Sequence, residues 1–589
     1  MQEPVRLVIW DLDETLWRGT LTEGGVEAVP ENFEIVRELC RRGIMSSICS
    51  KNDLEPVKSI LQKEGVWDYF IFPSIDWTPK GPRILQLIET VQLRAASVLF
   101  IDDNHQNLQE AQYFSPELQV ASHENIANLL GDRRLLGKAD PELSRLQQYR
   151  LLESRKALEH SFSGRVEDFL RDCDIRVVID YDVDRNIDRA VELINRTNQL
   201  NFTKQRLSED ASESRAHLRQ HLARFNVQAG LVRVVDRFGD HGFVGFFLQE
   251  AMLSGSRLVH YCWSCRTLGM KVETWLYRLM GRPKITVIGE VLTDLCASAP
   301  EINWIRQVAA AESLDSSTPT ARLGSVFIRG GCDLEPLAHY FRMVSRDVQL
   351  EVNLMRNGLA IRLDNSVMFR YAIEGRRISA SATQLGYVPA DFDTAVSSFT
   401  HDIWILSFWA DAAFPLYEAE GMQLPFAPPK LGHQDILAMK DNVVATNLEN
   451  DVQVNAYSAL RQQFVSRGLT SQDLFKENLE IILNHAPPEC LIFISLADES
   501  PPPGGELFRE RHTRLNRWVR EVTANWKNVR LLPIRDFIHD QSDVEGLNHF
   551  HRMVYYRLYQ AIIAMASSDT ATDSMAAASS VLGNQGSTM

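Results

Sequence analysis

The chain has 589 residues, enough for about four domains of ordinary size, so a single small binding module is excluded. Lys and Arg number 62 against 77 Asp and Glu, and the net charge of −15 argues against a free-standing nucleic-acid binder. The 8 cysteines are scattered along the chain, and no apolar run is long enough to cross a membrane. We expect a cytoplasmic protein with free thiols that binds neither nucleic acid nor membrane.

Short apolar runs alternate with helical stretches in the first part of the chain. The expected strands are 5–12, 44–50 and 97–103, and the expected helices are 31–43 and 54–65. This alternation predicts an α/β fold with a parallel sheet, in which ligands bind at the carboxyl ends of the strands. Asp11, Ser50 and Asp102 stand at those ends.

Changes in composition divide the rest of the chain. A charged, amphipathic stretch at 138–172 predicts a helical connector, and the Ser- and Thr-rich residues 311–322 predict a linker. Between them lies a mixed segment with a predicted hairpin turn at 239–242. The expected domains are 1–137, 173–310 and 323–566, followed by a low-complexity tail, 567–589, that is expected to be disordered.

Four polar elements follow the apolar runs of the first domain in order, and together they predict a phosphoryl-transfer site. They are Asp11 with Asp13, Ser50, Lys80, and Asp102 with Asp103. Carboxylates from separate strands suit Mg²⁺, while a hydroxyl and a lysine suit phosphate oxygens. Asp11 is the expected nucleophile and Asp13 the expected general acid and base. A lone DxDxT pattern is weak, and the alternative is surface aspartates that cap helices, but four elements in order favour the site.

These motifs, DLDETLW, CSKND, WTPK and FIDDN, resemble those of the haloacid dehalogenase superfamily, and the tryptophan and CSKND strings resemble its FkbH-like branch. The resemblance implies a Rossmann-like N-terminal domain. It also implies Mg²⁺ held by Asp11, Asp102 and the carbonyl of Asp13, with Asp103 beside them. Thr15, Lys51 and Asn52 belong to the same strings and are candidates for binding the substrate.

Three strings of the middle segment also resemble FkbH-like proteins, so the resemblance covers about residues 5–290. They are INRTNQLNFTKQRL at 194–207, VVDRFGDHGFVGFF at 234–247 and SCRTLGMKVETWL at 264–276. The resemblance implies an α+β domain of the acetyltransferase (GNAT) type. It further implies that the protein dephosphorylates D-1,3-bisphosphoglycerate and loads the glyceryl group onto the phosphopantetheine thiol of an acyl carrier protein for polyketide assembly.

Two cysteines compete for the role of holding the acyl group. Cys49 is next to Ser50, and Cys265 is next to Arg266, a cation that favours a thiolate. Cys49 is slightly preferred for its closeness to the phosphate site, although neighbouring residues of a strand point to opposite faces. For both, the alternative is a small buried side chain. Arg266 and His241 are candidates for binding substrate, and the alternative for His241 is a solvated residue in a polar turn.

The third domain begins with a strand, a glycine turn containing Cys332, and a helix, a layout that resembles the SGNH hydrolase fold with cysteine in place of serine. The string NHFHRMVYYRL resembles the histidine block of that fold, with His549 or His551 as the base. The usual aspartate three residues before the histidine is absent, and Ala410 stands where the oxyanion block has asparagine. A degenerate docking domain and an acyl-handling site at Cys332 and His549 both remain open.

Two other functions compete with the glyceryl transferase. One is a plain Mg²⁺-dependent phosphatase of a small phosphomonoester. The other is an inactive module that recruits a carrier protein, against which the complete aspartate set argues.

Overall fold

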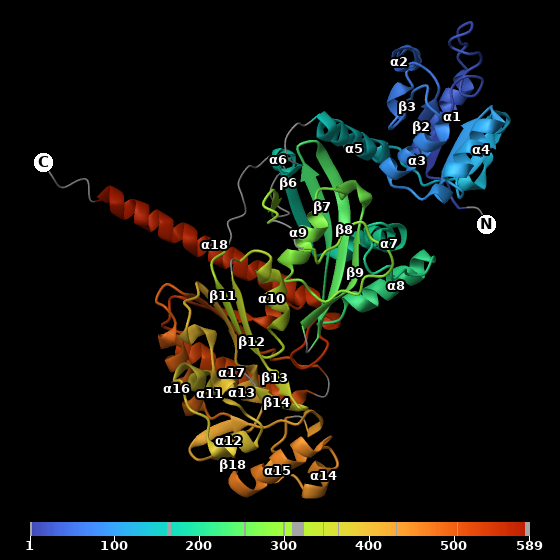
Figure 1. The fold of residues 1–589 in the computed structure, drawn as a ribbon. Helices are drawn as coiled ribbons and strands as arrows, with labels where there is room; N and C mark the ends of the chain where they lie inside the picture. The colour runs from blue at the N-terminus through green and yellow to red at the C-terminus, as the bar shows by residue number, and fades with distance from the viewer. Residues whose placement is uncertain are drawn as a thin grey trace, which may run out of the picture.

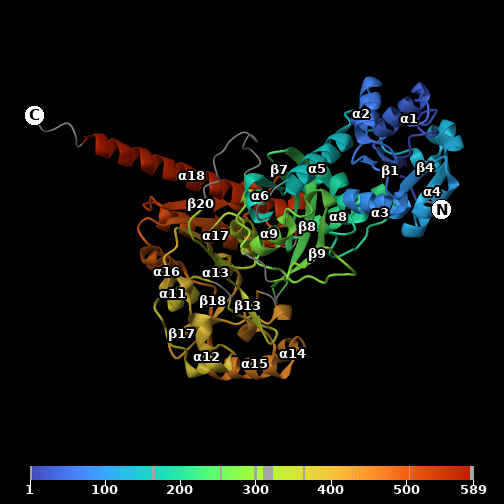
Figure 2. The same cartoon turned by 45° about the horizontal axis from the view of Figure 1, so that its top comes forward.

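A computed structural model describes residues 3–583 except 162–165, 253–254, 298–300, 309–322, 346, 363–364, 432 and 503–504. The predicted linker 311–322 therefore lies outside the described residues. Three units, each built on a five-stranded sheet, follow one another along a bent row, with the first at one end and the third at the other (Figures 1 and 2). Within the described part of the chain, no helix combines the length and hydropathy needed to span a bilayer.

The N-terminal unit is a five-stranded parallel sheet in the order β3-β2-β1-β4-β5. Its strands are β1 (Leu7–Trp10), β2 (Met45–Ser50), β3 (Ser74–Ile75), β4 (Val98–Asp102) and β5 (Gln119–Ser122), and its helices are α1 (Pro30–Arg41), α2 (Leu54–Lys63), α3 (Lys80–Val91) and α4 (His105–Phe114). The three strands and two helices predicted for this region are confirmed. Every residue of β1, β2 and β4 is buried, which explains why β1 and β4 are near-continuous apolar runs rather than alternating ones.

Two helices, α5 (Ser144–Ser161) and α6 (Val166–Asp172), form the predicted connector. The middle sheet that follows has the order β10-β6-β7-β8-β9, antiparallel except for β10 against β6. Its strands are β6 (Ile175–Asp180), β7 (Val227–Asp236), β8 (Gly239–Met252), β9 (Gly255–Trp263) and β10 (Ile305–Gln307), and its helices are α7 (Ile187–Arg196), α8 (Ala211–Leu222) and α9 (Val272–Leu279).

The predicted hairpin turn in this sheet is wrong by three residues. The turn is Arg237 and Phe238, and residues 239–242 already belong to β8. The Asp236 side chain accepts hydrogen bonds from the backbone N–H groups of Phe238 and Gly239, so an aspartate closes the turn before the glycine that the prediction favoured.

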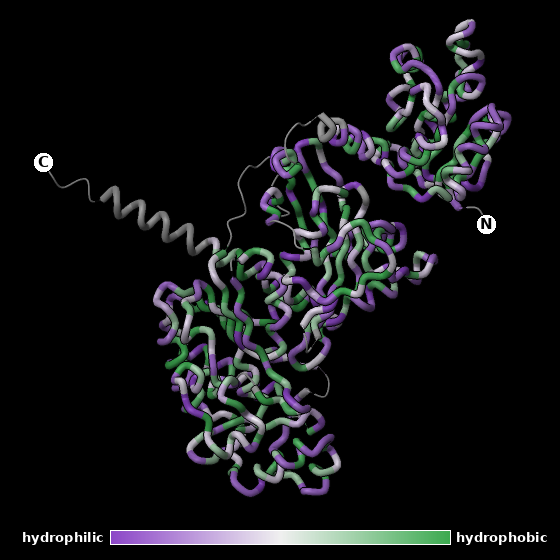
Figure 3. Tube along the Cα trace, in the orientation of Figure 1, coloured by the Kyte–Doolittle hydropathy of each residue, from purple (hydrophilic) through white to green (hydrophobic). Residues whose placement is uncertain are grey.

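The third unit is built on another five-stranded parallel sheet, in the order β12-β11-β15-β19-β20. Its strands are β11 (Val326–Gly330), β12 (Val348–Val352), β15 (Ile403–Ser407), β19 (Leu491–Leu496) and β20 (Val529–Pro533), and its helices are α10 (Glu335–Arg342), α13 (Trp409–Ala413), α16 (Gln472–His485), α17 (Glu506–Thr523) and α18 (Arg552–Gly583). Hydrophobic segments follow the strands of the sheets in Figure 3.

A smaller subdomain, which the sequence analysis did not separate, is inserted in this unit. It has its own apolar cluster, which extends from Leu359 to Phe464. Its elements are β13 (Leu354–Arg356), β14 (Leu359–Arg362), α11 (Ser366–Ile373), α12 (Ala380–Gln384), β16 (Leu416–Ala419), β17 (Met422–Pro425), α14 (Asp441–Ala445), α15 (Asp451–Gln463) and β18 (Val465–Gly468). Its short antiparallel strands lie between β12 and β19 in the sequence, so apolar runs of both units alternate along the chain.

The C-terminal segment differs from its prediction as well. Helix α18 continues to Gly583, so helix occupies most of the segment 567–589 that was expected to be disordered. This segment is rich in alanine, which has the highest helix propensity, and a low-complexity composition concealed that preference.

The middle and third units share one hydrophobic core. A single apolar cluster contains Tyr181 and Phe247 of the middle unit together with Tyr340 and Tyr555 of the third. The buried Arg552 guanidinium donates a hydrogen bond to the carbonyl oxygen of Tyr181 over 2.7 Å. These two units are therefore packed against each other as parts of one body.

Candidate functional site

The parallel register of the N-terminal sheet brings the predicted aspartates together. Trp10 pairs with Ile48 of β2 and with Ile101 of β4, and the Asp11 N–H then donates to the Ile101 carbonyl over 2.9 Å. Asp11 consequently follows β1 and Asp102 ends the neighbouring β4 at the same edge of the sheet, and both side chains are buried. Because parallel strands end together, residues 91 positions apart in sequence meet at one site.

Lys80 holds the two carboxylates. Its Nζ lies 2.6 Å from Asp11 Oδ1 and 2.7 Å from Asp102 Oδ2, and its side chain is 3% exposed. Burial by itself lowers the pKa of Lys80, but the two carboxylates outweigh it and raise that pKa above its ordinary value. Burial raises the pKa of Asp11 to about 6, with Lys80 opposing the rise and Asp102 adding to it. Lys80 is thus a charged lysine at the centre of a buried anionic group.

Ser50 completes the contacts of Asp11. Its hydroxyl donates to Asp11 Oδ1 over 2.8 Å, the same oxygen that Lys80 contacts. Arg83, a buried arginine, donates to the Ser50 carbonyl over 3.0 Å and thereby fixes the end of β2. Since both contacts of Asp11 fall on Oδ1, the other oxygen, Oδ2, is the one available to a substrate.

Asp13 lies two residues after Asp11, and its carboxylate accepts hydrogen bonds from a different set of residues. Its Oδ1 accepts from Trp17 Nε1 over 2.8 Å and from the Leu21 N–H over 3.3 Å. Its Oδ2 accepts from Asn52 Nδ2 over 3.1 Å, and Asn52 also contacts the Ser50 hydroxyl over 3.2 Å. The carboxyl group of Asp13 is therefore oriented by three donors, as a general acid has to be.

Asp102 and Asp103 are held by the loop that starts α4. Asp102 Oδ1 accepts from the Asn104 N–H over 2.8 Å and from Asn107 Nδ2 over 3.1 Å. The Asp103 N–H donates to the Thr15 hydroxyl over 3.0 Å, which ties this loop to the one that carries Asp13. Burial, followed by the charge of Asp102, raises the pKa of Asp103. Thr15, predicted to bind substrate, thus joins the two loops that carry the carboxylates.

The donor set fits a divalent cation. Carboxylate oxygens of Asp11, Asp102 and Asp103 lie within 4.8 Å of one another. Hard oxygen ligands of this kind are those that Mg²⁺ takes. Asn52 Oδ1 is buried without a hydrogen-bond partner among the described residues, which marks a place for a further polar group. The Asp13 carboxylate is not part of this group, because its oxygens are turned toward Trp17 and Asn52. The role of its carbonyl stays a prediction.

The structure argues against Cys49 as an acyl-holding nucleophile. Its side chain is fully buried in the apolar cluster on the other face of β2, and burial raises the pKa of its thiol to about 11. Neighbouring residues of a strand point to opposite faces, so Ser50 faces the carboxylates and Cys49 faces the core. Lys51 is exposed and has no contact with the carboxylate group among the described residues. The side chain of Cys265 lies outside the described residues.

Arg266 and His241 lie in the middle unit, away from the carboxylates. Arg266 Nη1 donates to the His241 carbonyl over 2.8 Å. The His241 ring is buried, with Nε2 at an ion-pair distance of 3.0 Å from Asp236 Oδ2, although the angle does not satisfy a hydrogen bond. His241 is therefore a buried residue of β8 rather than a solvated turn residue. Arg266 lines a cavity that is described below.

The third unit brings together two residues that are 217 positions apart. His549 Nε2 lies 2.9 Å from Cys332 Sγ, and Asn548 Nδ2 donates to the same sulfur over 3.7 Å. The His549 ring stacks on Phe225 of the middle unit, with centroids 4.0 Å apart. His551, the other candidate base, instead accepts from the Met553 N–H. We call Cys332, His549 and Asn548 the thiol site.

Burial keeps the thiol site neutral. It raises the pKa of Cys332 to about 12, with the charge of Asp333 adding to the rise, and it lowers the pKa of His549. Asp333, whose pKa burial raises to about 6, accepts from the Ser407 hydroxyl over 2.6 Å. Asp411, in the predicted oxyanion block, binds the N–H and hydroxyl of Ser366 instead. The site is thus a thiol–imidazole pair without an acidic partner for His549 among the described residues.

We call the group formed by Asp11, Asp13, Ser50, Lys80, Asp102 and Asp103 the aspartate site. Three residues that position its side chains were not predicted. Trp17 orients Asp13, Asn107 orients Asp102, and Arg83 fixes Ser50. Trp17 and Asn107 had a weak signal in the sequence, because they stand only four and five residues after Asp13 and Asp102, in the segments that directly follow these carboxylates. Arg83 had none, since its partners come from separate loops.

Comparison with known proteins gives distant likenesses. No family model and no curated protein matches the chain. One similar solved structure is the N-terminal part of a Bacteroides fragilis protein containing a phosphatase domain with Mg, at 22% identity and a TM-score of 0.21, covering 23% of this chain and 41% of that one. Two others are cobalt-bound deoxy-D-mannose-octulosonate 8-phosphate phosphatase from Haemophilus influenzae and 3-deoxy-D-manno-octulosonate 8-phosphate phosphatase from Moraxella catarrhalis with magnesium, phosphate and KDO.

The Haemophilus enzyme is 18% identical with a TM-score of 0.17, covering 19% of this chain and 66% of that one. The Moraxella enzyme is 13% identical with a TM-score of 0.17, covering 28% of this chain and 95% of that one. This chain thus spans less than two thirds of the first two structures. Likenesses this distant assign no function, so the chemistry proposed below rests on the geometry of the site.

Proposed function

We propose that the N-terminal unit is a Mg²⁺-dependent phosphatase that acts through an aspartyl-phosphate. The observation that carries the proposal is the contact of one buried lysine with both Asp11 and Asp102, with the Ser50 hydroxyl on the same Asp11 oxygen. A structural ion pair needs one carboxylate for one lysine, whereas this group holds three carboxylates with oxygens within 4.8 Å. An excess of buried negative charge is costly unless a cation offsets it.

The residues divide the reaction between them. Asp11 Oδ2 attacks phosphorus, the bond from phosphorus to the leaving oxygen breaks, and Asp13 gives its proton to that oxygen. Asp13 then takes a proton from water, whose oxygen attacks phosphorus and releases Asp11 and inorganic phosphate. Lys80 and the Ser50 hydroxyl donate to the oxygens that gain charge during transfer. Mg²⁺, held by Asp11, Asp102 and Asp103, supplies positive charge to the phosphoryl oxygens when it is bound.

The finer proposal is the transfer of a glyceryl group from D-1,3-bisphosphoglycerate to an acyl carrier protein. The sequence strings that resemble FkbH-like proteins support it, and so does the α+β unit that directly follows the connector. In the transfer, the carrier thiolate attacks the acyl carbonyl, the bond from that carbon to the acyl-phosphate oxygen breaks, and phosphate leaves with the electron pair. The aspartate site accounts for the other phosphate, which is an ester.

A second candidate function belongs to the thiol site. The 2.9 Å distance between Cys332 Sγ and His549 Nε2 favours an acyl-handling role over a docking role alone. His549 would take the thiol proton as sulfur attacks the acyl carbonyl, while the bond from that carbon to the acyl-phosphate oxygen breaks and phosphate leaves with the electron pair. The carrier thiol would then attack the same carbon and displace Cys332, which regains the proton. Because Cys332 and His549 are both neutral without substrate, the thiol proton has to move to His549 when the substrate binds.

The deciding experiment incubates the full chain with Mg²⁺, D-1,3-bisphosphoglycerate and a phosphopantetheinylated carrier protein, followed by intact-protein mass spectrometry. A glyceryl-sized mass gain on the carrier supports the transferase. If Cys332→Ala abolishes this gain, the acyl group passes through Cys332. If the gain is unchanged in Cys332→Ala, the carrier thiol attacks the donor directly. Phosphate release faster than the spontaneous hydrolysis of the substrate, with no mass gain on the enzyme or the carrier, would instead favour the plain phosphatase. Full phosphate release by Asp11→Asn would overturn the aspartyl-phosphate and favour the recruitment module.

A further inference from the structure

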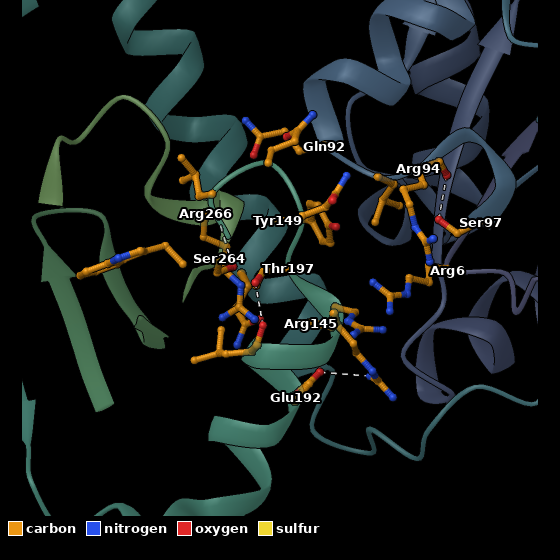
Figure 4. Close-up of a pocket in the computed structure, with 18 of the residues that line it drawn as sticks. Arg6, Gln92, Arg94, Ser97, Arg145, Tyr149, Glu192, Thr197, Ser264 and Arg266 are labelled. Atoms are coloured by element: carbon orange, nitrogen blue, oxygen red, sulfur yellow. Dashed lines mark hydrogen bonds and ion pairs between the residues drawn. The ribbon is translucent and has the colours of Figure 1, made fainter. Parts of the chain in front are cut away.

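An arginine-lined cavity lies between the N-terminal and middle units, and neither the phosphatase nor the transferase proposal uses it. Figure 4 shows Arg6 and Arg94 of the N-terminal unit on one side and Thr197, Ser264 and Arg266 of the middle unit on the other. Helix α5 passes beside them. The cavity has a volume of about 150 Å³ and is open to solvent. We call it the arginine cavity.

The arginine cavity is separate from the aspartate site. Arg6 directly precedes β1, and Ser97, another lining residue, directly precedes β4, whereas Asp11 follows β1 and Asp102 is the last residue of β4. At about 3.3 Å per residue, the five residues from Arg6 to Asp11 span about 16 Å. The cavity therefore lies at the amino edge of the same parallel sheet that carries the carboxylates at its other edge.

Positive charge dominates the lining. Six arginines line the cavity, and Glu192 is the one carboxylate among the described lining residues. The arginines are Arg6, Arg94, Arg145, Arg189, Arg196 and Arg266. In a protein whose net charge is −15, such a concentration of one sign marks a local function.

Glu192 is shared by the arginines of its own helix. Its two oxygens lie 2.8 Å from Arg189 Nη1 and 3.1 Å from Arg196 Nη1. Burial would raise the pKa of Glu192, but Arg189, then Arg196 and Arg145, lower it to about 2. Glu192 is thus fully engaged and Arg94 is paired with Glu3, so the positive charge in excess is that of the remaining lining arginines, Arg6 and Arg145 among them.

Arg6 shows this excess most clearly. Within the described part of the chain, its guanidinium has no hydrogen-bond or ion-pair partner. Burial, followed by the nearby charges of Arg196, Arg145 and Arg94, lowers the pKa of Arg6. An arginine held among other arginines without an anion costs stability, so a ligand that supplied the anion would be bound tightly.

We propose that the arginine cavity binds a compact phosphorylated anion, with its phosphate between Arg6, Arg145 and Arg196. Planar guanidinium groups bind phosphate oxygens in pairs, and arginine is the residue most suited to this. Thr197, Asn198 and Ser264 supply neutral hydrogen-bonding groups on the middle-unit side. A volume of about 150 Å³ suits a ligand of a few heavy atoms beyond the phosphate, and the opening leaves room for the remainder.

The two units contribute to the site together. Arg6 comes from the N-terminal unit, Arg145 from α5, and Arg196 from α7 of the middle unit. A phosphate that contacts all three therefore fixes the two units relative to each other. Binding at this cavity stands whether or not the aspartate site proves to be a phosphatase.

The test is calorimetric titration of the full chain in EDTA, so that the carboxylates of the aspartate site carry no cation and repel anions. The probes are inorganic phosphate, pyrophosphate and 3-phosphoglycerate. We expect at least one probe to bind and Arg6→Gln and Arg196→Gln each to weaken that binding by about tenfold or more, a loss typical of a charged hydrogen bond. Arg517→Gln is the matched control, because Arg517 is exposed on α17 of the third unit and contacts Glu521 over 3.8 Å.

Arg6→Gln also separates a ligand site from a structural role. Because Arg6 has no partner to lose, the variant is expected to melt at the same temperature as wild type or higher without ligand, and Arg6→Lys is expected to bind with intermediate affinity. Preference for 3-phosphoglycerate over phosphate would assign an organic phosphate, and equal affinity would assign inorganic phosphate. No binding of any probe, or equal binding by wild type and Arg6→Gln, would overturn the proposal.

Discussion

The aspartate site and the thiol site lie at the carboxyl ends of two five-stranded parallel sheets, but their buried carboxylates have different surroundings. Burial raises the pKa of Asp11 and of Asp333 to about 6 in each case. Asp11 has Lys80 at 2.6 Å, whereas Asp333 has the Ser407 hydroxyl at 2.6 Å. The same strand-end geometry thus gives a carboxylate paired with a cation in one unit and, in the other, a carboxylate bound by a hydroxyl next to a neutral thiol–imidazole pair. A parallel sheet gives the location of a site, and the partners of its carboxylate determine its chemistry.

The largest expected effect is the loss of phosphate release in Asp11→Asn. Without the attacking oxygen, we expect kcat to fall about a thousandfold or more. The measurement is release of inorganic phosphate with Mg²⁺ present. Cys332→Ala is the control from the other site and should keep the wild-type rate. A loss of less than tenfold in Asp11→Asn would show that another group attacks phosphorus.

Lys80→Met tests how much the lysine cation stabilises the buried carboxylates of the aspartate site. Removal of a 3% exposed lysine leaves Asp11 and Asp102 buried without their cation, so we expect the N-terminal unit to be destabilised by about 3–5 kcal/mol in the absence of Mg²⁺. The first transition in a calorimetric melt reports this loss. Lys51→Met is the matched control, because Lys51 is an exposed lysine of the next loop. Equal melting of the two variants would contradict the assigned role of Lys80.

The thiol site should react slowly despite its histidine. Since burial raises the pKa of Cys332 to about 12, we expect iodoacetamide to label it at least about tenfold more slowly than the exposed Cys296 at pH 7.5. Peptide mapping of a timed reaction measures both rates in one sample. Faster labelling of Cys332, abolished by His549→Ala, would instead show a thiolate–imidazolium pair.

Trp17→Phe tests whether Asp13 is the acid of the aspartate site. The change removes the Nε1 donor to Asp13, and we expect a fall of about tenfold in kcat for an alkyl phosphate. The fall should be much smaller for p-nitrophenyl phosphate, whose leaving group needs no proton. Comparing the two substrates separates poor orientation of an acid from loss of buried packing, which would slow both equally.

The smallest expected effect concerns pH. Asp333 has a folded-state pKa of about 6 against an ordinary value of 3.8, so its contribution to stability is present below about pH 4 and is lost as the pH rises through about 6. Asn does not ionise, so Asp333→Asn does not lose this stability as the pH rises. The melting temperature of the variant minus that of the wild type should therefore increase from pH 4 to pH 7. A constant difference across that range would show that Asp333 does not titrate there.

The sequence indicated which polar residues of the first sheet lie together, because they stand at the ends of its strands. Asp11, Ser50 and Asp102 each follow a buried run, and parallel pairing places the ends of such runs at one edge. The hairpin turn and the tail were predicted less well, since the first depended on a side-chain contact of Asp236 and the second on the helix propensity of alanine.

The sequence by itself determined the strands of the first sheet and the polar residues at their carboxyl ends, because motif and strand period are local properties. The tertiary structure decided which distant residues meet. It placed Cys49 in the core and His549 beside Cys332, and it gathered arginines of two units and their connector around one cavity. Contacts between residues far apart in sequence depend on packing, which no local pattern records.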